Sequence, residues 1–133
     1  MKGQANTITQ GTATITVTFR GVTGTATLNV GPVAPTSLSI TPMGGTLPLN
    51  SMTPYHAILL WSDNHTTDET QTSTWTSSAP GGGDSGPGVA TVSNTGTRGV
   101  VTAVGAGNAT IRASYTYMGG ATFGDSVNVT VTP

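Results

Sequence analysis

The chain has 133 residues, of which 7% are charged, with a formal net charge of −1 at pH 7 and no cysteine. This charge balance excludes a basic surface for nucleic acid or for anionic membranes. The missing cysteine excludes disulfides and zinc–thiolate sites, so stability has to come from packing.

Threonine makes up about a fifth of the chain and is interleaved with Val, Ile, Leu and Ala, a composition typical of strands. Apolar residues recur with a period of two and nowhere with a sustained period of 3.6, which predicts an all-β protein. In residues 11–30 this alternation continues on both sides of a turn that we place at 21–24. The pattern predicts a hairpin with one apolar face. Its apolar positions are Ala13, Ile15, Val17, Phe19, Ala26, Leu28 and Val30.

A boundary is predicted after this hairpin, where Pro32 and Pro35 stand close together. Proline cannot donate to a strand ladder and stiffens an extended connection. We therefore expect a hairpin segment at 1–31, a linker at 32–35 and a domain at 36–133.

The domain is predicted to contain short strands separated by turn signals. They fall at 38–40, 47–49, 55–61, around Trp75, at 89–93 and at 99–104, with a closing hairpin over 107–131. Strands of this length in about 100 residues indicate a two-sheet Greek-key sandwich. The inward-facing parity predicts a core that contains Leu59, Trp75, Val92, Ile111 and Val129.

The stretch "GNATIRASY" at 107–115 repeats the pattern of "GTATITVTF" at 11–19. The strands that follow them also share a parity. We interpret each copy as the closing hairpin of one repeat. Residues 1–31 are then the end of a preceding repeat, and the domain that follows is a whole one.

Four runs of the domain resemble the bacterial immunoglobulin-like domain of group 2. They are "WSDNHTTDET", "WTSS", "GVATVS" and "GVVTAVGAGNATIRASY", in the family's order and spacing. The chain departs from the family pattern at Asn64 and His65, which replace a turn glycine, and in the inserted "PGGGDSGPG". The resemblance implies an immunoglobulin-like two-sheet Greek-key sandwich preceded by an extra hairpin.

The same resemblance implies a non-catalytic spacer or adhesive module in tandem on an extracellular or cell-surface protein. Its partners would be neighbouring Ig-like repeats. The N-terminal "MKGQANTITQ" contains no apolar signal region, so we expect any export signal to lie on a longer parent protein. No apolar run reaches the 18 or so residues of a membrane span, so no membrane insertion is expected.

Candidate chemistry is sparse. A Ser-His-Asp set can be written from Ser62, His65 and Asp68, but no Gly-x-Ser-x-Gly elbow accompanies it, so we predict no enzyme and no resident cofactor. The carboxylates of Asp63, Asp68 and Glu69 are a candidate for weak calcium binding, because calcium takes several loop oxygens. Asp63 fits an Asx turn equally well.

Two further functions stay open. The domain could bind a host protein or a glycan through loops 63–71 and 80–88, or through an exposed Trp61, although the parity of Trp61 favours the rim of the core. Alternatively, identical chains could assemble by strand exchange through the apolar hairpin face. Its assembly residues would be Ile15, Val17, Phe19, Leu28 and Val30.

Overall fold

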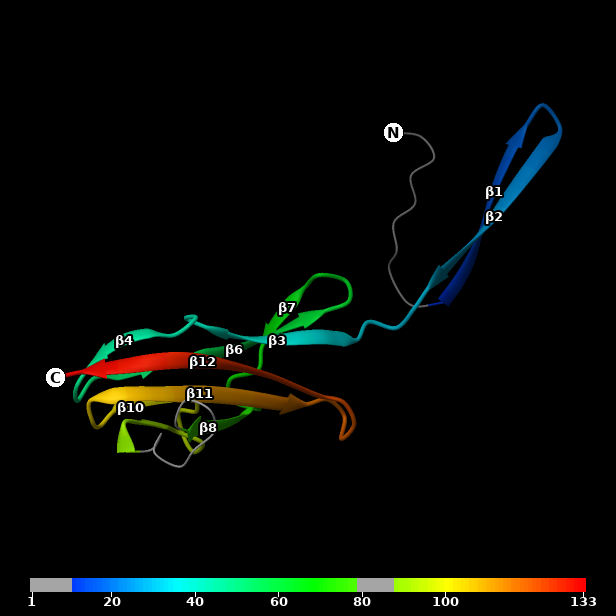
Figure 1. Cartoon of the computed structure of the whole chain (residues 1–133). Coiled ribbons are helices and arrows are strands. Elements are labelled where there is room, and N and C mark those ends of the chain that lie inside the picture. Colours follow the sequence, from blue (N-terminus) through cyan, green and yellow to red (C-terminus); the bar gives the residue numbers. More distant parts are fainter. Residues whose placement is uncertain (1–10, 79–87) are drawn as a thin grey trace. The chain divides into compact units, whose positions relative to one another are not determined.

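The computed structural model describes residues 11–78 and 88–133, and these residues form an all-β structure of two compact units, Met1–Ala34 and Pro35–Pro133 (Figure 1). The second unit begins with a strand at Pro35, which the sequence had assigned to the linker. Nowhere in the described residues is there a helix long and apolar enough to cross a membrane.

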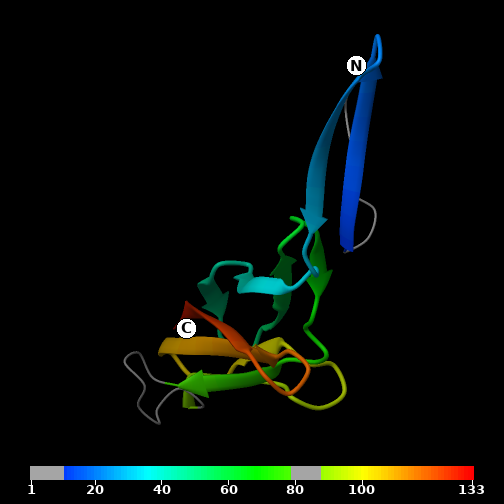
Figure 2. The same cartoon turned by 90° about the vertical axis from the view of Figure 1, so that its right-hand side faces the viewer.

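The first unit is an antiparallel hairpin of β1 (Gly11–Phe19) and β2 (Val22–Val30), whose strands run beside each other over their full length (Figure 2). The predicted turn at 21–24 is wrong in position. The chain reverses at Arg20 and Gly21, with φ of 50° and 78°. A two-residue turn with two positive φ angles matches the twist of paired strands, so β2 starts directly after it.

One layer of the second unit is a four-stranded sheet in the order β4–β12–β11–β8. It contains β4 (Gly45–Pro48), β8 (Thr74–Ser78), β11 (Gly107–Thr116) and β12 (Thr122–Thr132). The β11–β12 pair is the predicted closing hairpin, flanked by β8 on one edge and by β4 on the other. The pairing of β4 with β12 is parallel, whereas the other pairs of this sheet are antiparallel.

The facing layer consists of two short sheets, β3–β6–β7 and β5–β10–β9. Their strands are β3 (Pro35–Thr41), β5 (Met52–Pro54), β6 (His56–Trp61), β7 (Thr66–Asp68), β9 (Ala90–Val92) and β10 (Val100–Ala103). The strand predicted at 55–61 thus continues from β5 through Tyr55 into β6. The N–H of Tyr55 donates to the carbonyl of Gly99 at 2.9 Å, so the two sheets join into one layer at this point.

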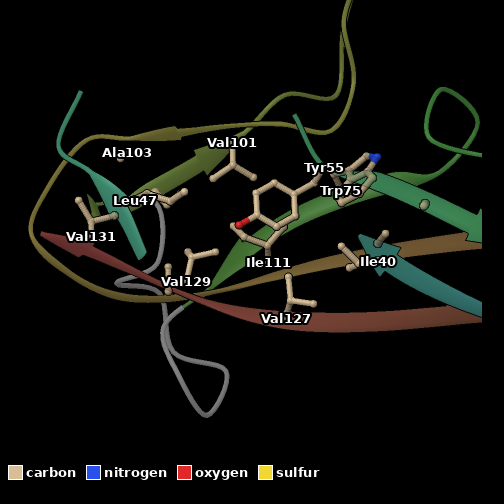
Figure 3. Close-up of a cluster of buried hydrophobic side chains, with 14 of the residues drawn as sticks. Ile40, Leu47, Tyr55, Trp75, Val101, Ala103, Ile111, Val127, Val129 and Val131 are labelled. Atoms are coloured by element: carbon tan, nitrogen blue, oxygen red, sulfur yellow. The ribbon is translucent and has the colours of Figure 1, made fainter. Parts of the chain in front are cut away.

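The core lies between these layers. In Figure 3 the side chains of Tyr55 and Val101 point toward those of Ile111 and Val129 from the opposite sheet. The four predicted core residues Leu59, Trp75, Ile111 and Val129 are each at most 1% exposed. Val92 differs from the prediction, because it is only half-buried at the margin of the core. Its strand β9 is three residues long and is paired with β10 on one side.

Side chains also bind the backbone where strands lack a neighbour. The Asn94 Oδ1 atom accepts the N–H of Trp75 at 2.7 Å, and the Asn94 amide donates to the Trp75 carbonyl. Asn94 thereby occupies the outer edge of β8 as a paired strand would. Across the core, Asp125 Oδ2 accepts the N–H of Ile40 at 2.8 Å and links the two layers.

Candidate interaction surfaces

The hairpin of β1 and β2 has two chemically distinct faces. Residues directly opposite each other in its register share a face, so the threonines of β1 lie opposite Thr23, Thr25, Thr27 and Asn29. The other face, called here the hairpin face, is made of Ala13, Ile15, Val17, Phe19, Val22, Ala26, Leu28 and Val30. Val17, Phe19 and Val22 are 64%, 69% and 73% exposed. Single exposed aliphatic residues are common, whereas a continuous apolar strand face is a candidate interaction surface.

The hairpin face is the same surface that the second unit buries in its own closing hairpin. Gly11 pairs with Val30 as Gly107 pairs with Val131, and the registers then match for nine successive pairs. In the second unit the equivalent residues Ala109, Ile111 and Val129 are fully buried. The two hairpins therefore have the same construction and differ in whether a second layer covers them.

The three candidate calcium ligands lie in the segment from β6 to β8, but the structure does not gather them. Asp63 Oδ1 accepts the N–H of His65 at 3.2 Å, and Asp68 Oδ1 accepts the N–H of Thr70 at 2.9 Å. Both contacts are Asx turns. Glu69 accepts the hydroxyls of its threonine neighbours instead. Within the described residues, no three His, Asp or Glu side chains are close enough to hold a metal ion.

Asp68 has a structural role, because it holds Thr70 in place. Thr70 is buried, accepts the N–H of Ala57 at 3.0 Å through its hydroxyl, and donates that hydroxyl to Asp68. Burial alone would raise the pKa of Asp68, but the hydrogen bonds from Thr70 and the nearby His56, whose Nδ1 lies 3.3 Å from Oδ2, hold this pKa below its usual value. The pKa of the exposed Asp63 is likewise lowered: desolvation opposes the shift, and the contacts with His65 produce it.

These contacts also separate the candidate catalytic residues. The His65 ring contacts Asp63 and stacks on Trp61, while Asp68 is bound to Thr70 and His56. His65 and Asp68 thus have different partners in the described residues.

Trp61 lies at the rim of the core, half-buried. His65 is stacked on it with ring centroids 5.3 Å apart and planes 8° apart, and Tyr117 meets it edge-on at 5.6 Å. The indole N–H donates to Thr67 at 2.9 Å. A sugar would have to compete with His65 for that face of the indole, which weakens the hypothesis of a glycan platform here.

Sequence reasoning missed a shallow groove of about 350 Å³ along β5, β9 and β10. Its lining combines the apolar Met52, Val92 and Val100 with the hydroxyls of Ser93 and of the threonines 91, 95, 97 and 102. No charged side chain lines it. The signal was weak, because threonines in alternating strands are also what a solvated sheet face requires.

The second candidate loop, 80–88, lies almost entirely outside the described residues. On β6, the outward residues His56 and Leu60 are exposed and Ile58 is half-buried. Ile58 is opposite Ser39 on one side and Asp68 on the other, so polar residues interrupt this apolar pair.

Comparison with known proteins gives fold-level matches. No family model and no curated protein matches the chain. Among solved structures, domains 4 and 5 of the S-layer protein SbsC match with a TM-score of 0.59 at 19% identity, over 93% of this chain and 59% of that one. A structure of SbsC domains 1–6 matches with a TM-score of 0.58 at 19% identity, over 92% of this chain and 16% of that one.

The chain therefore has the β-domain fold found in a bacterial surface-layer protein and spans a small part of the longer SbsC structures. Since Pro35–Pro133 make up about three quarters of the chain, a match over 93% extends into the hairpin unit.

Proposed function

We propose that the chain is a non-catalytic structural module of a bacterial cell-surface protein, in which immunoglobulin-like repeats of the group 2 kind follow one another as spacers. The observation that carries the proposal is the duplicated hairpin. One chain holds two hairpins of matching register, and a short segment with Pro32 in it joins the first hairpin to the unit that contains the second. Repetition of one supersecondary unit at a fixed interval is what a tandem array requires.

The composition of the surface supports the same role. With four basic and five acidic residues, the module has no charged field that would select a nucleic acid or an acidic ligand. The SbsC domains share the fold and stand in a multi-domain surface protein, which supports a cell-surface location. In the segment 61–70, Asp63 and Asp68 accept hydrogen bonds within turns, and Glu69 accepts threonine hydroxyls.

The test measures how the length of the particle grows with the number of copies of the second unit. Chains with one, two and three copies of residues 35–133 behind the hairpin are compared by small-angle X-ray scattering. The 11-residue β12 spans about 36 Å, so each copy should add roughly 35–40 Å to the maximum dimension. Copies that fold back without extending the particle would contradict a spacer.

Adhesion is the second candidate, and the hydroxyl-lined groove is the observation that favours it. The unmodified chain is applied to glycan and host-protein arrays beside a variant with Thr102→Lys in the groove lining. A spacer gives no signal with either chain, whereas an adhesive module gives a signal that the lysine removes.

A further inference from the structure

The closing hairpin of the second unit shows what the hairpin face lacks. On β11 the outer edge pairs with β8, on β12 the outer edge pairs with β4, and the apolar face packs on the facing layer. The hairpin of β1 and β2 has the same register, and among the described residues of its unit each of these strands pairs only with the other. An isolated two-stranded hairpin is marginal in water, so this surface requires a partner.

Gly11 has the same backbone conformation as Gly107, which begins the covered strand β11. Its φ is 143°, against 141° for the equivalent Gly107. A Cβ on Gly107 would meet the Val89 side chain at 3.1 Å, whereas the same position on Gly11 is open. The first hairpin therefore begins with the same glycine as β11, but no described residue corresponding to Val89 covers it.

Exchange between identical chains does not cover this face. In each chain the described residues form two hairpins of this kind and one facing layer. If the first hairpin replaces β11 and β12 in a neighbour, the displaced pair exposes its own apolar face. A ring or a filament of swapped chains therefore leaves as many uncovered hairpins as separate monomers do.

Packing two hairpin faces against each other is also insufficient. A strand of nine residues is about 30 Å long and two strands are about 10 Å wide, so each face offers roughly 300 Å². Two such faces bury about 600 Å² in total, whereas stable protein interfaces bury about 1,200 Å² or more.

We infer that the partner of the hairpin face is the facing layer of another immunoglobulin-like repeat, joined upstream of Gly11 in the same polypeptide. This inference rests on the proposed tandem array. The partner supplies an apolar sheet that corresponds to β3, β6 and β10, with edge strands that correspond to β4 and β8. Covalent linkage gives the high effective concentration that such a small contact needs.

The side chains that differ between the two hairpins indicate the sizes of the residues that face them in the partner layer. Val17 stands where the second unit has Ala113, and Leu28 where it has Val129, so the partner layer has smaller residues opposite them. Ala26 replaces Val127, which requires a larger residue. Gly24 replaces Asp125, so the carboxylate link to the facing layer is absent from this repeat.

The experiment adds the missing layer. Residues 36–106 are joined directly to Gly11 of the full chain, so that the hairpin occupies the position of a closing hairpin. Amide hydrogen exchange of residues 11–30 is measured at low concentration, with light scattering to confirm a monomer. Protection of these amides should rise at least about 100-fold over the unextended chain. A second extended chain restores the closing-hairpin residues through V17A, A26V and L28V and should show equal or greater protection.

An I15D variant of the extended chain should lose the added protection while the Pro35–Pro133 unit stays protected. Fast exchange of residues 11–30 in both extended chains would overturn the inference. So would hairpin amides that are already protected in the unextended chain, as a monomer or in a concentration-dependent oligomer. Neither result affects the extension per copy seen by scattering, so the proposed spacer function is tested separately.

Discussion

Replacing Ile111 with alanine is the sharpest test of the core, because the chain contains its own control. Ile111 is fully buried, and Ile15 occupies the equivalent position of the hairpin at 40% exposure. Both lie in the same local sequence, Ala-Thr-Ile, so the change in strand propensity is shared. The pair of substitutions then shows whether a loss of stability in the Pro35–Pro133 unit is specific to the buried position.

Deleting a buried isoleucine to alanine costs about 2–5 kcal/mol, from the lost transfer free energy and the cavity that remains. We expect Ile111→Ala to fall in this range and to lower the Tm of the Pro35–Pro133 unit by roughly 10–20 °C. Ile15→Ala should change the unfolding free energy of that unit by less than about 0.5 kcal/mol.

Urea unfolding followed by tryptophan fluorescence measures both, because Trp75 is buried in the same core. A cost below about 1 kcal/mol for Ile111→Ala would refute the assignment of the core. An equally large effect of Ile15→Ala would show that the hairpin is already covered in the isolated chain.

Three further changes test individual contacts. Asn94→Ala removes both hydrogen bonds to the Trp75 backbone and should cost about 1–3 kcal/mol by urea unfolding. Asn94→Asp keeps an acceptor for the N–H but sets a carboxylate oxygen against the Trp75 carbonyl, so it should cost at least as much, and unchanged unfolding of both variants would contradict this contact. Because the folded pKa of Asp68 is lowered, its contribution to stability is complete above the unfolded pKa of about 4 and is lost as the pH falls through the folded value. Asp68→Asn should therefore flatten the acid side of a Tm–pH curve, and an unchanged acid limb would contradict this role. Gly44→Ala should prevent stable folding, judged by circular dichroism, because φ is +90° and the new Cβ would lie 2.2 Å from the Asn128 carbonyl oxygen.

Calcium binding by the carboxylates of segment 63–69 stays a hypothesis, which the hydrogen bonds of these side chains disfavour. Since each carboxylate already serves a turn or a threonine, we expect millimolar calcium to leave the Tm unchanged relative to a chelator. A rise in Tm that Asp63→Asn removes would restore the calcium site.

The strands and their inward faces follow from the sequence because a period of two is a local property of the chain. The equivalence of Ile15 and Ile111 was visible for this reason. The contacts of Asn94, Thr70 and Asp125 were not, since each joins a side chain to backbone far along the sequence, and periodicity carries no information about such contacts. The half-burial of Val92 was not predictable either, because it depends on the position of β9 at the edge of its sheet.

Only part of the candidate site can be predicted from the sequence. An apolar hairpin face can be read from alternation, but the dispersal of Asp63, Asp68 and Glu69 into separate contacts depends on turn geometry. Short strand β7 lies inside the loop predicted at 63–71 and orients Asp68 toward His56. Proximity in sequence was therefore a poor guide to proximity of the carboxylates.

The parallel pairing of β4 with β12 has a mechanical consequence. β4 belongs to the first part of the second unit and β12 to its end, and Val129 to Thr132 pair with Gly45 to Pro48 in the same direction. A pull on the two ends of the unit draws these strands past each other along their length. Their hydrogen bonds are then loaded together in shear instead of opening one after another, so this contact should resist stretching until the whole pair slips.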